Sequence, residues 1–262
     1  MKAMSALRPY VASVIGELED ESLIHIGSGL VCEVVDPNII TAEHVLALPS
    51  VPDELTGEHV RIVRKRYATD AIHEATAIQS PQATCKFPVD LARFEVGGNT
   101  LKGCAQSVLD IERVPRKERF SGSDLFLLLG LPGVKSRTLF GQVTVTLYGA
   151  LTTLALITEK RFDSNLHVGF AYQAHGWLDT NGESIAPLDP HGMSGSAVWN
   201  LNLPEDYRDW RPELATVAGI AIDIQDDNKV IVATCAREVN DFAFPSNRIV
   251  EAAIASDSIR EI

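Results

Sequence analysis

Eight residues in the last third of the chain, Gly192–Trp199 (GMSGSAVW), constrain its fold more than any other stretch. A serine between glycines, followed at once by an apolar run, predicts a tight turn that leads into a buried strand. Glycine at positions 192 and 195 lets the backbone bend sharply and lets another molecule approach it closely. A glycine-flanked Ser194 is a weak signal on its own, so its meaning depends on the rest of the chain.

Two earlier segments carry residues that can activate such a serine. Residues 39–46 (IITAEHVL) place His44 at the end of an apolar strand, and residues 87–94 (FPVDLARF) place Asp90 at the start of another. With Ser194 they supply a nucleophile, a base and a carboxylate that orients the base. Each residue alone is explained equally well as a polar strand end or a turn residue, so the coincidence of all three indicates catalysis.

The order of the three residues excludes the α/β-hydrolase plan and argues against the subtilisin plan. None of the seven histidines follows Ser194, whereas an α/β-hydrolase needs its histidine after its serine. The subtilisin order, with aspartate before histidine, stays formally open through Asp20 or Asp36. Neither of these lies in a strand-end setting like that of Asp90, and the chain lacks the alternation of strands and helices that this plan requires.

The chain resembles the trypsin-like (chymotrypsin-fold) serine peptidases. Three motifs carry the resemblance, in family order: GSGLV at 27–31 followed by ITAEH at 40–44, then VDLA at 89–92, then GMSGS at 192–196. The likeness extends over about residues 11–256. The GMSGS form also resembles some bacterial members outside the digestive branch.

The resemblance implies an all-β fold, with two antiparallel β-barrels of the chymotrypsin type and a short C-terminal helix. Residues 1–262 would form a single trypsin-like peptidase domain. Its parts would be an N-terminal barrel at about 11–111, a connection at about 112–120, a second barrel at about 121–244 and the helix at about 245–256. The residue pattern itself predicts a last strand over 230–236 and a helix over 245–254, capped by Ser246 or Asn247.

The resemblance also implies the chemistry of a serine endopeptidase. His44 would take the proton of the Ser194 hydroxyl as it attacks a peptide carbonyl, and Asp90 would hold the imidazole in the required tautomer. The backbone N–H groups of Gly192 and Ser194 would form the oxyanion hole, and an acyl-enzyme would follow. The scheme needs no cofactor and no metal ion.

Substrate contacts are predicted from the alignment of the same motifs. Leu188 falls at the floor of the specificity pocket, where it would suit an apolar or small side chain. If the loop is shifted by one residue, Asp189 takes that place and would suit Lys or Arg; we prefer the apolar alternative. His191 is either a cleft residue or an ordinary loop residue. The edge strand that would pair with the substrate backbone contains Ile222, Asp223 and Ile224.

Two positions depart from the family pattern. Met193 stands where activatable digestive members carry an aspartate that receives the new N-terminus after cleavage of the zymogen. Because methionine cannot form that ion pair, we expect an oxyanion loop that is either preformed or ordered by a protein partner. Glu43 replaces the usual small residue before His44, and we expect its side chain to point outward.

Composition and absent signals bound the cellular setting. The net charge of −12, from 23 basic and 35 acidic residues, argues against binding to nucleic acid. The N-terminus lacks the apolar core of a signal peptide, and no run approaches the roughly 18 apolar residues of a membrane span. We expect a cytoplasmic protein that does not bind membranes, with reduced thiols and no zinc site, since no C-x-x-C pair links Cys32, Cys85, Cys104 and Cys235.

The expected partner is a polypeptide substrate. An activating protein is the alternative to a preformed oxyanion loop. Three alternatives stay open: a catalytically silent trypsin-like binding module, a latent peptidase that a partner activates, and an esterase or transferase that uses the same triad. Intact His44, Asp90 and Ser194 count against the silent module. Substrate assays separate the others.

Overall fold

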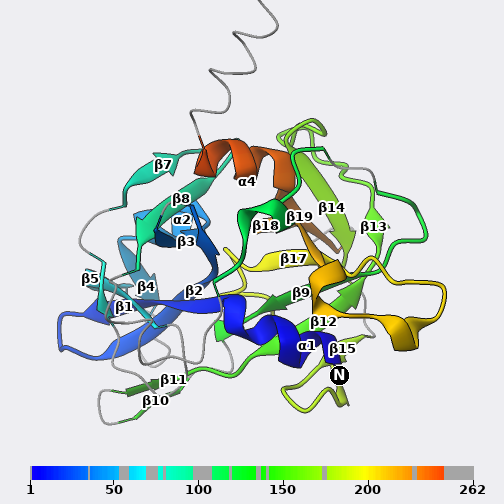
Figure 1. Ribbon diagram of the computed structural model, residues 1–262. Helices are drawn as coiled ribbons and strands as arrows, with labels where there is room; N and C mark the ends of the chain where they lie inside the picture. The colour runs from blue at the N-terminus through cyan, green and yellow to red at the C-terminus, as the bar shows by residue number, and fades with distance from the viewer. Residues whose placement is uncertain are drawn as a thin grey trace, which may run out of the picture.

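Two antiparallel sheets form the framework of the protein, as the computed structural model in Figure 1 shows. The structure describes residues 2–34, 36–52, 59–68, 76–78, 81–96, 108–117, 120–133, 137–139, 142–172, 176–225 and 229–244. The two sheets come from the two halves of the chain and lie side by side.

The first sheet holds the strands of the N-terminal half. They are β1 (Val11–Leu18), β2 (Leu23–Glu33), β3 (Pro37–Thr41), β4 (Ser50–Pro52), β5 (His59–Ala68), β6 (Thr76–Ala77), β7 (Ala83–Cys85) and β8 (Leu91–Glu95). Their order is β4-β5-β1-β2-β3-β8-β7, with β6 paired to β5. Strands β3 and β8 are neighbours, and this pairing brings the His44 and Asp90 segments together.

The second sheet holds the strands of the C-terminal half. They are β9 (Phe126–Gly130), β12 (Tyr148–Thr152), β13 (Leu154–Ala155), β14 (His167–Ala171), β15 (Trp177–Leu178), β16 (Ser184–Ile185), β17 (Ala197–Asn200), β18 (Thr216–Gln225) and β19 (Val230–Cys235). Their order is β13-β14-β19-β18-β17-β9-β12-β15-β16. The apolar run after Ser194 is β17, which is fully buried between β9 and β18 as the sequence predicts. A separate ribbon pairs β10 (Arg137–Leu139) with β11 (Gln142–Thr144).

Short helices complete the described chain. They are α1 (Lys2–Leu7), α2 (Glu43–Ala47), α4 (Ala236–Ala243) and the 3₁₀ turns η1 (Arg8–Tyr10), η2 (Ile111–Arg113), η4 (Tyr207–Asp209) and η5 (Pro212–Leu214). The predicted last strand over 230–236 ends one residue early, because α4 begins at Ala236 directly after β19. The helix predicted over 245–256 lies outside the described residues.

Helix α4 forms where the sequence analysis expects the end of the second barrel. Its residues Ala236, Val239 and Ala243 are buried and share one face that packs into the main apolar core. The helix contacts strands of both sheets, and Arg93 of β8 donates a hydrogen bond of 2.5 Å to the carbonyl of Ala243. Helix α4 therefore joins the two sheets across the top of the view in Figure 1.

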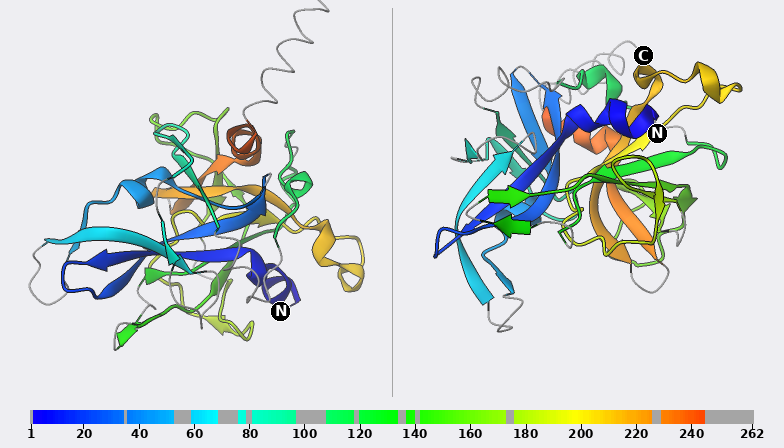
Figure 2. Two further views of the ribbon diagram at one scale, coloured as in Figure 1. Left: turned by 60° about the vertical axis from the view of Figure 1, so that its left-hand side comes forward. Right: turned by 90° about the horizontal axis from the view of Figure 1, so that it is seen from below.

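The main core lies between the sheets and is built from both. Leu30 and Leu91 of the first sheet share it with Leu127 and Trp199 of the second, and all four are buried. This architecture confirms the predicted all-β fold class, with two antiparallel sheets that come from the two halves of the chain. Among the described residues, neither barrel is closed by a complete ring of strand pairing (Figure 2).

Two further observations concern the described residues alone. No helix among them is long and apolar enough to cross a membrane. They also contain no disulfide and no group of three or more metal-ligating side chains.

Candidate active site

His44 and Asp90 meet where β3 ends beside the start of β8. His44 lies in the first turn of α2, which begins two residues after β3, and Asp90 directly precedes β8. The carboxylate of Asp90 accepts two hydrogen bonds from His44, at 2.6 Å from ring Nδ1 to Oδ2 and at 2.9 Å from the backbone N–H to Oδ1. Because Nδ1 must carry a proton to donate it, the other ring nitrogen, Nε2, is the one that can accept a proton.

Asp90 adopts an unusual backbone conformation to make these contacts. Its φ of +50° lies in the left-handed region, which aspartate tolerates better than most residues with a side chain. The side chain is almost fully buried, whereas nearly half of the His44 side chain is exposed. A buried carboxylate thus supports an imidazole that faces the solvent.

The Ser194 loop is a tight turn fixed by two glycines and anchored to both sheets. Gly192 and Gly195 have φ values of +87° and +86°. A Cβ atom on Gly195 would lie 2.0 Å from the carbonyl oxygen of Ser28, so no larger residue fits there. The carbonyl of Ser194 accepts a hydrogen bond of 2.8 Å from the N–H of Ser28, and the N–H of Gly195 donates one of 2.8 Å to Ala221.

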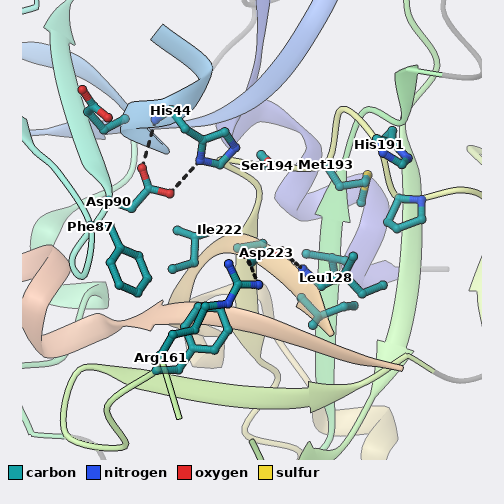
Figure 3. Close-up of a pocket in the computed structure, with 16 residues that line it drawn as sticks. His44, Phe87, Asp90, Leu128, Arg161, His191, Met193, Ser194, Ile222 and Asp223 are labelled. Carbon is teal, nitrogen blue, oxygen red and sulfur yellow. Dashed lines mark hydrogen bonds and ion pairs between the residues drawn. The ribbon is translucent and has the colours of Figure 1, made fainter. Parts of the chain in front are cut away.

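All three predicted catalytic residues line one cleft of about 550 Å³. In Figure 3 the Ser194 side chain lies beside the His44 ring, on the side away from Asp90. No hydrogen bond joins the Ser194 hydroxyl to the ring within the described part of the chain. Such bonds are often long without substrate and shorten when it binds. The cleft is lined by Glu43, His44, Phe87, Asp90, Leu128, Arg161, Phe162, Pro190, His191, Met193, Ser194, Ala221, Ile222, Asp223, Ile224 and Ile231.

The two predicted oxyanion donors have no acceptor among the described residues. The carbonyl of His191 accepts a hydrogen bond of 2.6 Å from Gly133, and the carbonyl of Met193 accepts one of 2.9 Å from Ser196. In a planar trans peptide the C=O and the following N–H point in opposite directions. The N–H groups of residues 192 and 194 therefore point away from these partners. Ser194 lines the cleft, whereas Gly192 does not.

Two side chains of β2 hold the Ser194 loop from the first sheet. His25 Nε2 donates to the carbonyl oxygen of Gly192 at 3.2 Å, and the Ser28 hydroxyl donates to the same oxygen at 3.1 Å. The Ser28 hydroxyl also accepts from the N–H of Leu131, and His25 Nδ1 pairs with the Ser13 hydroxyl at 2.8 Å. Burial lowers the pKa of His25 to about 4, so the ring is neutral at physiological pH.

The electrostatics of His44 are dominated by opposing effects. Burial lowers the pKa of its imidazole, but the hydrogen bond and the negative charge of Asp90, with smaller contributions from Asp223 and Glu43, outweigh burial and raise it. Glu43, whose side chain was expected to point outward, is among the residues that line the cleft. Glu43 is the first residue of α2 and directly precedes His44 in the chain.

The residues predicted to contact substrate divide into two groups. His191 and the strand residues 222–224 line the cleft, whereas Leu188 and Asp189 do not. Leu188 packs against the core of the second sheet, and its carbonyl accepts a hydrogen bond from Tyr172. The half-exposed Asp189 pairs with the ring and the backbone N–H of His191, as turn aspartates often do with nearby backbone groups.

The sequence analysis missed several cleft residues that come from separate segments. The guanidinium of Arg161 forms an ion pair of 2.9 Å with Asp223, another of 2.7 Å with Glu159, and lies 4.5 Å from the centre of the Phe162 ring. Phe87 is half exposed and packs edge-on against Phe162. These residues form no motif with each other along the chain, so no pattern could have identified them.

Comparisons with known proteins support no family assignment. No family model and no curated protein matches the sequence. The protease Anisep from Arthrobacter nicotinovorans is 11% identical, with 87% of this chain and 90% of that chain covered and a TM-score of 0.47. The HL collagenase is 11% identical, with coverages of 90% and 91% and a TM-score of 0.46. Tobacco etch virus protease complexed with product is 8% identical, with coverages of 88% and 75% and a TM-score of 0.44. Because these TM-scores lie below 0.5, we base no statement about chemistry on them.

Proposed function

We propose that this protein is a serine endopeptidase that hydrolyses peptide bonds with Ser194, His44 and Asp90. The observation that carries the proposal is the pair of hydrogen bonds from His44 to Asp90 in a cleft that Ser194 also lines. In the same loop, the backbone N–H groups of Gly192 and of Ser194 itself have no acceptor among the described residues. These are the components that acyl transfer to a serine requires.

The reaction begins with proton transfer from the Ser194 hydroxyl to Nε2 of His44 as the oxygen attacks the peptide carbonyl. The carbonyl oxygen becomes negatively charged and accepts hydrogen bonds from the N–H groups of Gly192 and Ser194. The C–N bond then breaks, the amine leaves with the proton from His44, and an ester to Ser194 remains. Water hydrolyses this ester by the same steps and restores the free enzyme.

The contacts of the Ser194 loop favour a peptidase that is active without a separate activation step. Met193 cannot make the ion pair of the activatable members, but it is buried in the core of the second sheet. The carbonyl of Gly192 is held instead by His25 and Ser28. We propose that these contacts order the loop without a zymogen cleavage or an activating partner.

A fluorophosphonate probe tests the proposal, because it reacts with an activated serine and not with an ordinary hydroxyl. We expect the wild type to be labelled, and Ser194→Ala and His44→Ala to remain unlabelled. Ser196→Ala is the matched control, since Ser196 lies in the same loop but does not line the cleft, and it should be labelled like the wild type. Absence of labelling in folded wild-type protein would contradict the proposal of constitutive activity and leave the latent peptidase and the silent binding module.

Asp90→Asn tests the orienting role without removing the side chain. An amide in this position stabilises the other imidazole tautomer, so we expect kcat to fall by about 10⁴-fold. Peptide hydrolysis measured alongside the thermal unfolding midpoint separates this effect from misfolding. Wild-type kcat in a folded Asp90→Asn variant would exclude the assigned role.

A further inference from the structure

One group of cleft residues carries no charge and belongs to the core of the second sheet. Leu128 of β9, Ala221 of β18, Ile231 of β19 and Met193 are members of the same buried apolar cluster. All four also line the cleft that contains Ser194. Beside the nucleophile, the cleft therefore opens onto the apolar interior of the second sheet.

A bulge in β18 decides which isoleucine faces this interior. The pairing of β18 with β19 shifts between Ala221 and Asp223. Ile222 and Ile224 therefore join different clusters, although residues two positions apart share a face of a regular strand. Ile224 packs with the core of the second sheet, where its direct partner across the strands is Ile231. Directly paired residues lie on one face of a sheet, so these two branched side chains narrow the apolar part of the cleft.

The charged side chains of the cleft lie outside this apolar cluster. The charged or titratable side chains that line it are Glu43, His44, Asp90, Arg161, His191 and Asp223, and none belongs to the apolar cluster. Arg161 and Asp223 neutralise each other in an ion pair. Figure 3 shows Phe87 and Arg161 on one side of Asp223 and Leu128 on the other. Asp189, the residue that would have favoured a basic substrate, does not line the cleft.

We propose that Leu128, Ile224 and Ile231 form the pocket for the substrate residue on the acyl side of the scissile bond, and that this residue is aliphatic, between Ala and Leu in size. The inference rests on the proposed peptidase function. A lysine or arginine side chain here would place an unpaired charge against buried apolar groups, which is strongly unfavourable. Two branched side chains next to each other on this face of the sheet take up room that an aromatic ring would need.

Peptidyl diphenyl phosphonates that differ only in the side chain next to phosphorus test this pocket in the full-length protein. We expect the Val and Leu probes to label Ser194 about 10²-fold faster than the Lys probe, and the Phe probe to react about tenfold more slowly than the Leu probe. Labelling rates come from intact mass spectrometry. A Lys probe that reacts as fast as the Leu probe would overturn the inference, and so would a Phe probe that reacts fastest.

Substitutions of the two isoleucines on β18 give a matched pair. Ile224→Ala should raise the Phe-to-Leu rate ratio at least about tenfold, because it removes one wall of the pocket. Ile224→Asp should raise the Lys-to-Leu ratio. Ile222→Ala deletes the same atoms two positions earlier on the same strand, from a side chain that packs in the other apolar cluster, and should change both ratios much less than Ile224→Ala does. Equal changes in both Ala variants, or none in either, would show that these residues do not form the pocket.

A small fluorophosphonate without a peptide side chain separates the two proposals. If it labels Ser194 while the peptidyl probes favour Lys, the peptidase function stands and the aliphatic pocket is wrong. If it fails to label folded wild-type protein, the proposed function fails and the inference that rests on it fails too.

Discussion

His25 Nε2 lies 3.2 Å from the carbonyl oxygen of Gly192, so a buried imidazole of the first sheet is bonded to the loop that carries the nucleophile on the second. The two residues are 167 positions apart in the chain. The peptide that follows this carbonyl leads to Met193 and Ser194, and its orientation sets the direction of the proposed oxyanion donors. A contact between the two halves of the molecule thus orders the site.

His25→Ala is expected to lower kcat by about tenfold or more with little change in KM. The variant removes one of two donors to the Gly192 carbonyl, which loosens the oxyanion donors, and loss of one such donor outright costs about 10²–10³. Steady-state peptide hydrolysis measures both parameters. Ser13→Ala removes only the partner of the other ring nitrogen and should have a smaller effect. If kcat of folded His25→Ala equals that of the wild type, His25 does not position the loop.

The stability of the protein should fall between pH 6.5 and about 4 because of His25. Burial lowers the pKa of this imidazole to about 4, so over that interval the unfolded chain binds a proton that the native state does not. The contribution is present above pH 6.5 and is lost on acidification, with a total of about 3 kcal/mol. Urea unfolding at several pH values measures it. His25→Gln should show a correspondingly smaller loss, and an identical pH dependence in the two proteins would contradict the assignment.

Gly195→Ala should destabilise the fold by about 2–4 kcal/mol. The new Cβ would lie 2.0 Å from the Ser28 carbonyl oxygen, at a φ of +86° that side chains rarely adopt. Gly122→Ala is the matched control, because nothing lies within 4 Å of its Cβ position. We expect its free energy of unfolding to stay within about 0.5 kcal/mol of the wild type. Equal denaturant midpoints for the two variants would refute the close approach at Gly195.

Peptidase activity should decline on acidification with a midpoint above 6.5, the ordinary pKa of histidine. His44 must be neutral to act as a base, and its environment raises its pKa, so the protonated, inactive form persists to higher pH. Glu43→Gln removes one negative charge that contributes to this shift and should move the midpoint of kcat/KM to lower pH. A midpoint that moves upward in Glu43→Gln, or stays unchanged, would show that Glu43 does not act on His44.

Local patterns predicted the fold class, and the three motif residues His44, Asp90 and Ser194 line one cleft. The glycines at 192 and 195 are required because their φ values are positive, and a glycine-flanked serine before an apolar run indicates that conformation. The His44 and Asp90 motifs meet because the apolar strands β3 and β8 pair with each other. The catalytic roles of these residues stay predictions until an assay tests them.

The alignment of the motifs, which counts residues back from Ser194, did not identify the residues of the specificity pocket. It placed Leu188 at the floor, but that residue packs against the core of the second sheet outside the cleft. Loops of different length shift such an alignment, whereas the cleft is defined by whichever side chains the two sheets bring together. The sequence analysis also placed the end of β19 one residue late. The strand ends at Cys235 because α4 begins at Ala236 and buries one face in the core.

The sequence by itself determined the order of His44, Asp90 and Ser194, the tight turn around the serine and the predominance of strands, since each depends on residues close together in the chain. Only the tertiary structure decided that Arg161 neutralises Asp223, that His25 holds Gly192, and which isoleucine of β18 packs with the core of the second sheet. These relationships join residues from distant segments or depend on a single bulge, and the packing of two sheets fixes them.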